Sequence, residues 1–247
     1  MRLSPLYSTS SAGKGSTAMG QPPPFASANS EALLRLAQFA LRLLASTQAS
    51  SSVARKDLAA LAAAIDSARM CFRSFGGFDS LHALQALEPR AASREPRQAL
   101  TALQHVSMLL YHPLELRYWL QARMPSCSPS LRSSQLISAL WLFWIACGGA
   151  LAYLDLAEAR RRLEELRARR TREESEEWRE ARAAAAAACR RLAKLTLDAA
   201  LALHWTVEHP TWRLSDLQLG LVGTASSLLA VHASWICHAK TYRLKQH

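Results

Sequence analysis

The sequence lacks the motifs on which most enzymes depend. It has no glycine-rich phosphate-binding loop, no Gly-x-Ser-x-Gly nucleophile turn and no His-Glu-x-x-His metal pair. No acidic residue lies at helical spacing near His105 to form a ligand set with His112. His204 and His209 are five residues apart, which places them on different faces of a helix. We therefore expect no enzymatic activity, no cofactor and no bound metal.

The sequence also lacks paired cysteines and a secretory signal. Its five cysteines are widely separated and include no Cys-x-x-Cys pair, which excludes a disulfide framework and a structural zinc site of the usual spacing. The first 24 residues contain no continuous apolar core, so they do not read as a secretory signal.

Glycine and proline are scarce beyond the first 30 residues, whereas alanine, leucine and arginine are abundant. These three residues are good helix formers, so the composition predicts an all-α fold. Residues 1–30 are rich in serine, glycine and proline, and we expect them to be a disordered tail.

Charge is absent from two long stretches, 133–154 and 217–239. The first has 22 residues, which as a helix is about 33 Å long and matches a hydrocarbon core of about 30 Å. The second is more polar, but Gly220, Gly223 and Ser227 place small residues where membrane helices approach each other. Both stretches are predicted transmembrane helices, and these three small residues are predicted to support helix packing and self-association.

The region 31–132 is predicted to form amphipathic helices, the first of them starting at Ser30. In the next, residues spaced by three and four form an apolar stripe, namely Leu58, Leu61, Ile65, Ala68, Phe72 and Phe75. A core helix of a soluble bundle and a helix lying in a membrane interface both fit this stripe. In the interfacial interpretation, Phe72, Phe75 and Phe78 insert among acyl chains. The basic residues beside them bind lipid headgroups, namely Arg55, Lys56, Arg69 and Arg73.

Residues 98–119 are expected to form a further helix that is broken near Pro113. The segment 155–216 is the most charged part of the chain and is predicted to be a solvated helix or a helical hairpin.

The net charge of +11 is spread along the chain and suits an anionic membrane or a nucleic acid. Nine carboxylates between residues 155 and 194 disfavour nucleic acid, so we expect no such partner.

Three stretches together resemble the peroxin-11 family of peroxisomal membrane proteins. The first is Ser67–Gly76, which is similar to the family's arginine-containing amphipathic segment. The second is Tyr111-His112-Pro113-Leu114-Glu115, which is similar to an aromatic-Pro-x-Glu element of the gamma-like branch. The third runs from Leu197-Asp198 through His204-Trp205 to the Gly-x-x-Gly-x-x-Ser-Ser pattern of residues 220–227.

The resemblance implies a multi-pass protein of the peroxisomal membrane that elongates the membrane before peroxisome division. It further implies an anionic phospholipid surface, self-association into a homo-oligomer, and fission-machinery proteins as partners. The predicted organisation is a membrane-associated helical bundle with these segments: tail 1–30, amphipathic region 31–132, span 133–154, connector 155–216, span 217–239 and tail 240–247.

Two spans place both termini on one side of the membrane, and the resemblance implies the cytosolic side. Seven arginines lie between residues 160 and 172, against three in the eighteen residues before the first span. That bias favours a cytosolic connector instead. We follow the resemblance on this point.

Two other functions fit the sequence. One is a pore or metabolite-permeability protein of the same membrane, with a path lined by Gln218, Thr224, Ser227 and His232. The other is a soluble helical adaptor that binds protein or RNA.

Overall fold

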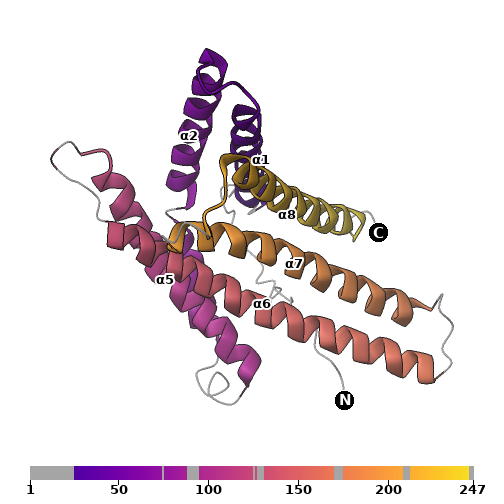
Figure 1. Ribbon diagram of the computed structural model, residues 1–247. Coiled ribbons are helices and arrows are strands. Elements are labelled where there is room, and N and C mark those ends of the chain that lie inside the picture. The colour runs from indigo at the N-terminus through magenta and orange to yellow at the C-terminus, as the bar shows by residue number, and fades with distance from the viewer. Residues whose placement is uncertain are drawn as a thin grey trace, which may run out of the picture.

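The computed structural model describes residues 25–73, 75–87, 95–124, 126, 131–169, 175–207 and 212–244, with only the backbone described at 25–29, 131 and 237–244. Every regular element within these ranges is an α-helix (Figure 1). The predicted all-α fold is therefore confirmed. Most of the predicted tail, residues 1–24, lies outside the described residues.

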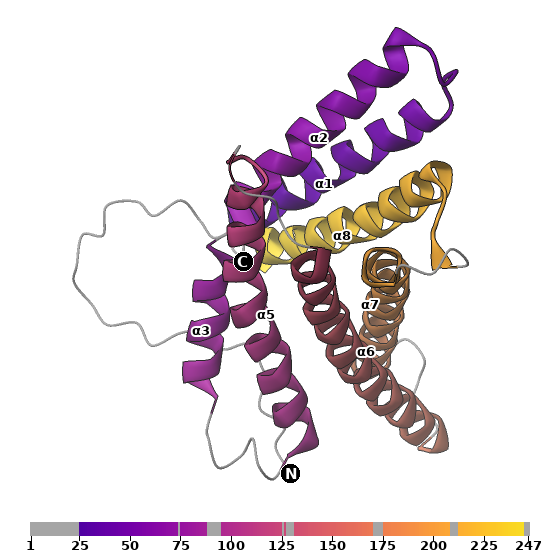
Figure 2. The same cartoon turned by 60° about the vertical axis from the view of Figure 1, so that its left-hand side comes forward.

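Helices α1 (Phe25–Ser46) and α2 (Val53–Arg73) form a hairpin that projects from the rest of the molecule (Figures 1 and 2). α1 starts at the residue that follows the Pro22–Pro24 run, earlier than the predicted Ser30. The hydroxyl of Ser52 accepts a hydrogen bond of 3.1 Å from the backbone N–H of Arg55 and caps the start of α2. The serine-rich linker therefore sets the turn of this hairpin.

Helix α3 (Gly76–Ala86) begins at the Gly76-Gly77 pair, which separates it from α2. A β-carbon at Gly76 would lie 2.8 Å from Nε2 of His112, so a larger residue here would require the His112 ring to move. α5 (Pro96–Gln121) packs between α3 and α6.

The predicted break at Pro113 is wrong, because α5 is continuous through this residue. Proline in a helix interior costs about 3 kcal/mol through a lost hydrogen bond and a ring clash. Contacts of α5 with α3, α6 and α2 stabilise the helix on both sides of the proline and outweigh that cost.

Helices α6 (Leu131–Ala168) and α7 (Glu176–Thr206) form a long antiparallel hairpin (Figure 1). The hydroxyl of Ser175 caps α7 by accepting a hydrogen bond from the N–H of Trp178. Alanines let the two helices approach closely, and the buried contacts are Ile145 and Ala152 with Leu195 and Ala202, then Leu166 with Trp178 and Ala181. The charged connector is therefore divided between the end of α6 and α7, and the last part of α7 returns along the uncharged half of α6.

Helix α8 (Asp216–Leu244) runs alongside α1 and contacts α7, while α6 and α7 run off in another direction (Figure 2). Phe39, Leu201 and Leu219 form the core where α1, α7 and α8 meet. Helices α6 and α8 are both long and apolar enough to cross a membrane, and they contain the two predicted spans. Only 33% and 28% of their most apolar windows are buried. A core helix of a soluble protein would be mostly covered, so this exposure favours contact with lipid.

Candidate functional site

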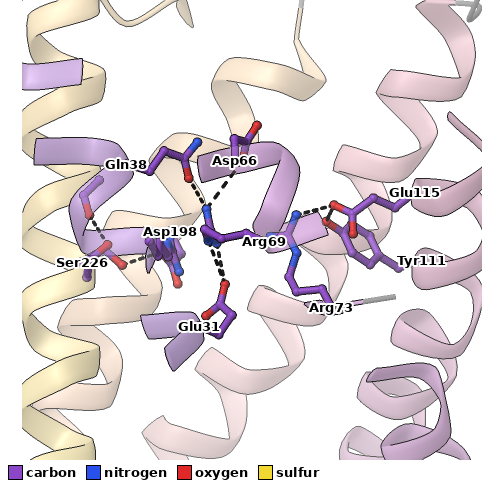
Figure 3. A network of polar contacts seen from close by, with 12 residues as sticks. Glu31, Gln38, Asp66, Arg69, Arg73, Tyr111, Glu115, Asp198 and Ser226 are labelled. Atoms are coloured by element: carbon purple, nitrogen blue, oxygen red, sulfur yellow. Dashed lines mark hydrogen bonds and ion pairs between the residues drawn. The ribbon is translucent and has the colours of Figure 1, made fainter. Parts of the chain in front are cut away.

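The three stretches singled out in the sequence meet in one buried polar cluster (Figure 3). The first stretch supplies Arg69 and Arg73 from α2, the second Tyr111 and Glu115 from α5, and the third Asp198 from α7. Residues that are far apart in the sequence therefore form one site between the α1–α2 hairpin and the rest of the molecule.

Arg69 lies at the centre of this cluster and is only 4% exposed. Its Nη2 donates to Oε1 of Glu31 at 2.6 Å and its Nε to the same oxygen at 3.1 Å. Nη1 donates to Gln38 and lies 3.6 Å from a carboxylate oxygen of Asp66. Burial alone would raise the pKa of Glu31, but Arg69 and the other nearby arginines hold it below its ordinary value.

Arg73 extends the cluster to α5. Its guanidinium donates to Oε1 of Glu115 at 2.6 Å, and the hydroxyl of Tyr111 donates to the same oxygen. Burial raises the pKa of Glu115, and the positive charge of Arg73 offsets this only in part. Burial also raises the pKa of Tyr111. The phenol therefore stays a neutral hydrogen-bond donor at physiological pH.

Asp198 joins three helices at the other end of the cluster and is 1% exposed. Its carboxylate accepts from Arg35 of α1, from Lys194 at 2.6 Å and from the hydroxyl of Ser226 of α8 at 2.5 Å. Burial would raise the pKa of Asp198, but Arg35 and Lys194 lower it below its ordinary value. The carboxylate is therefore ionised and fully paired.

A cavity of about 520 Å³ lies beside the cluster. Five cationic and four acidic side chains line it, which leaves one positive charge in excess. The opposite wall comes from the first span, with Ile137, Trp141 and Trp144. The indole of Trp141 packs against that of Trp205, with ring centroids 5.8 Å apart.

The sequence analysis missed this cavity, although α1 carries a signal for it. Glu31, Arg35, Gln38 and Arg42 recur at steps of four, three and four, so they form a polar stripe on one helix face. All four line the cavity. Such a stripe is usually assigned to the solvent side, whereas here it faces inward and Leu33 on the outer face is 54% exposed.

Helix α2 likewise turns polar groups inward and leaves large apolar side chains exposed. Its buried side holds Ala62 and Arg69, while Leu61 is 51% and Phe72 66% exposed. Ile65 is half-buried. The predicted apolar stripe is therefore real as a pattern, but most of it does not pack into a protein core.

Phe72, Phe75 and Phe78, here called the phenylalanine patch, lie where α2 ends and α3 begins. They are 66%, 70% and 63% exposed. Helix α3 leans on α5 through its other side, where Ser80 is buried. The three rings predicted to insert into a membrane therefore lie within seven residues of one another in the sequence, and the described residues leave them largely exposed.

The four predicted headgroup-binding residues do not form one surface. Arg55 and Lys56 lie at the start of α2, about 26 Å along the helix from Phe72. Arg55 is half-buried and pairs with Asp216 at 3.2 Å, while Lys56 is exposed. Arg69 and Arg73 point into the polar cluster, where carboxylates occupy their guanidinium groups. A headgroup role for Arg69 does not fit this position, because its donors face protein acceptors and not the outside.

The small residues of α8 pack against α1. A β-carbon at Gly220 would lie 2.7 Å from Cα of Leu43, and one at Gly223 would overlap the ring of Phe39. Ser227 is fully buried and its hydroxyl donates to the carbonyl of Gly223 at 2.7 Å. Helix packing by these residues is therefore present within one chain. Because α1 occupies this face, the predicted self-association through Gly220, Gly223 and Ser227 would need another surface of α8.

The side chains proposed to line a pore do not meet at the cavity. Ser227 is occupied within α8, and Gln218 accepts from the backbone N–H of Ser215 at the start of that helix. Neither these two nor Thr224 and His232 are among the residues that line the cavity.

Within the ranges that the structure describes, no three histidine, cysteine or acidic side chains are placed to hold a metal ion.

Comparison with known proteins gives one clear result. No curated protein and no solved structure matches the chain. A family model described as Peroxisomal biogenesis factor 11 (PEX11) matches residues 27–235, which is most of the chain and includes the polar cluster, the phenylalanine patch, the first candidate span and most of the second. The match does not separate branches of the family, so the gamma-like assignment stays a prediction. The chain belongs to the peroxisomal biogenesis factor 11 family, whose members act in peroxisome biogenesis at the peroxisomal membrane.

Proposed function

We propose that this biogenesis factor elongates the peroxisomal membrane before division by inserting its phenylalanine patch into the cytosolic leaflet. The observation that carries the proposal is the inverted α1–α2 hairpin, which buries Arg69 and exposes Leu61, Phe72 and the rest of the patch. In water this arrangement is unfavourable, because large apolar patches are left uncovered. Against a membrane, exposure of the same apolar surface is favourable.

The free energy of burying the three rings is sufficient for membrane binding. Full burial of a phenylalanine side chain contributes about 1.5–3 kcal/mol, so three rings together supply several kcal/mol for insertion. Lys56 adds about 1 kcal/mol if it reaches an anionic surface. Rings that enter one leaflet only expand that leaflet, and a high local concentration of such wedges curves the membrane.

Self-association supplies that concentration in this proposal. Another face of α8, away from the glycines, carries Leu217, Leu221, Leu228 and Trp235, each at least 45% exposed. Contact between copies through this face clusters the wedges, and the elongated membrane then becomes a substrate for fission-machinery proteins. In this proposal α6 and α8 are the two spans.

The test is tubulation of anionic liposomes by the purified full-length protein. Replacing the three patch residues by serine should abolish tubulation, because the wedge loses its apolar surface. A matched control replaces Leu103, Leu110 and Leu120 of α5 by serine, since these are 47%, 52% and 46% exposed but lie on another helix. Equal loss in both triple variants would show that the phenylalanine patch has no special part in remodelling.

A second candidate is a pore or permeability function. The observation that favours it is the charge-lined cavity beside α6, because ionisable groups next to a membrane span often mark solute pathways. Conductance of the purified protein in planar bilayers, reduced by Arg35→Gln, would support this function. Release of the protein by carbonate extraction would contradict both membrane functions and favour a soluble adaptor.

A further inference from the structure

The cavity has two unlike walls. Helix α1 provides charged and polar groups along about 16 Å, from Glu31 to Arg42. Helix α6 faces them with Ile137, Trp141 and Trp144. The volume of about 520 Å³ lies within the range of about 300–1,000 Å³ typical of small-molecule sites. A molecule that fills this space must be polar along one side and apolar along the other.

Arg42 is the cavity-lining arginine that has no acidic partner among the described residues. Arg35, Arg69 and Arg73 each pair with a carboxylate, whereas the guanidinium of Arg42 lies 5.9 Å from the ring centroid of Phe39. This accounts for the excess positive charge of the lining. At the far end, Nε of Arg73 and Nδ1 of His112 are buried without a hydrogen-bond partner in the described part of the chain. The described residues therefore leave the charge of Arg42 and these two buried nitrogen atoms without partners.

The apolar wall belongs to the first candidate span, which contains Ile137, Trp141 and Trp144. With this helix in a membrane, the cavity lies beside the depth of the acyl chains. The Trp141 and Trp205 rings pack against each other at a tilt of 32°, so each has one face already occupied by an aromatic ring. An acyl chain fits such a wall better than a flat heterocycle does.

We propose that the cavity binds an anionic lipid with one acyl chain, whose acidic head pairs with Arg42 and whose chain lies along Ile137, Trp141 and Trp144. The head is a carboxylate or a phosphate monoester. Its source is either a free fatty acid or a lysophospholipid taken from the membrane. This site is separate from the phenylalanine patch and does not depend on membrane remodelling.

The test uses quenching of tryptophan fluorescence in the full-length protein, held in phosphatidylcholine nanodiscs. Dibromostearic acid and a dibrominated lysophosphatidic acid are titrated separately, each with and without excess unbrominated competitor. Competable quenching reports a site, whereas partition into the bilayer gives quenching that competitor does not remove. Dibromostearyl alcohol has the same chain without the negative charge and measures the contribution of the head.

Two variants and one control define the site. Arg42→Ala should weaken competable quenching roughly ten-fold or more, because hydrogen bonds to charged groups contribute most strongly in such sites. Ser138→Phe should abolish it by filling the cavity beside the apolar wall. Arg117→Ala removes an exposed arginine of α5 outside the cavity and should leave it unchanged. Circular dichroism checks that each variant keeps its helical content.

Each outcome of the quenching experiment either supports the lipid site or overturns it. Competable quenching by the fatty acid alone assigns the free acid, and quenching by the lysophosphatidic acid alone assigns the membrane lipid. Absence of competable quenching, equal affinity of the Arg42 and Arg117 variants, or equal affinity for the uncharged alcohol would overturn the proposal. Loss of tubulation by the patch variant with unchanged quenching would leave the lipid site intact.

Discussion

Removal of the Asp198 carboxylate tests whether the buried cluster holds the molecule together. Asp198 is 1% exposed and links α7 to Arg35 of α1 and Ser226 of α8. In Asp198→Ala, Arg35 and Lys194 keep their charges beside each other without a counter-ion. Breaking a buried pair in this way costs about 3–5 kcal/mol. For a chain of this size, that cost lowers the unfolding temperature by roughly 6–20 °C.

The assay is thermal unfolding of the full-length protein in a mild detergent, followed by circular dichroism. The control is Glu165→Ala, which breaks the Arg161–Glu165 pair on the surface of α6, where the side chains are 68% and 46% exposed. Such a pair contributes less than about 1 kcal/mol, so the control should shift the transition by a few degrees at most. The double variant Arg35→Met with Asp198→Leu should be more stable than Asp198→Ala, because no unpaired charge remains on Arg35. A shift for Asp198→Ala no larger than that of the control would refute the reasoning.

Three further predictions use the same unfolding assay. Gly223→Ala should destabilise the protein by about 1–3 kcal/mol, because the new methyl group overlaps a phenylalanine ring of α1. Gly149→Ala, with no atom within 4 Å of the new methyl group, should instead be neutral or stabilising by up to about 1 kcal/mol. Pro113→Ala should raise stability by as much as about 3 kcal/mol, since the helix already continues through this position. Asp198 and Glu31 have pKa values below their ordinary 3.8 and 4.5, so their stabilisation is present at neutral pH and is lost as the pH falls below about 4. Asp198→Asn should make this acid transition less steep, and an unchanged slope would contradict the assigned pKa shift.

The elements themselves were largely predictable. Long runs without charge predicted the hydrophobic parts of α6 and α8, and helical spacing predicted the helix that became α2. Local signals such as these depend on neighbours within one or two turns. The error at Pro113 has the opposite origin, because packing against other helices overrode a local preference.

The site was predictable only in part. The phenylalanine patch is exposed, as the interfacial interpretation expects. The basic residues beside it were assigned to the same surface, yet Arg69 and Arg73 turn inward. A periodic pattern shows which side chains share a face, but it does not show what that face touches.

The sequence by itself determined that the chain is helical, that two segments are long and apolar enough to cross a membrane, and which residues share each helix face. These properties follow from composition and from the helical repeat, which act locally. Only the tertiary structure decided that α1 and α2 turn their polar stripes inward and that Arg35 meets Asp198, 163 residues away. The physical reason is that a buried charge needs a specific partner, and that partner can come from any helix the fold brings near.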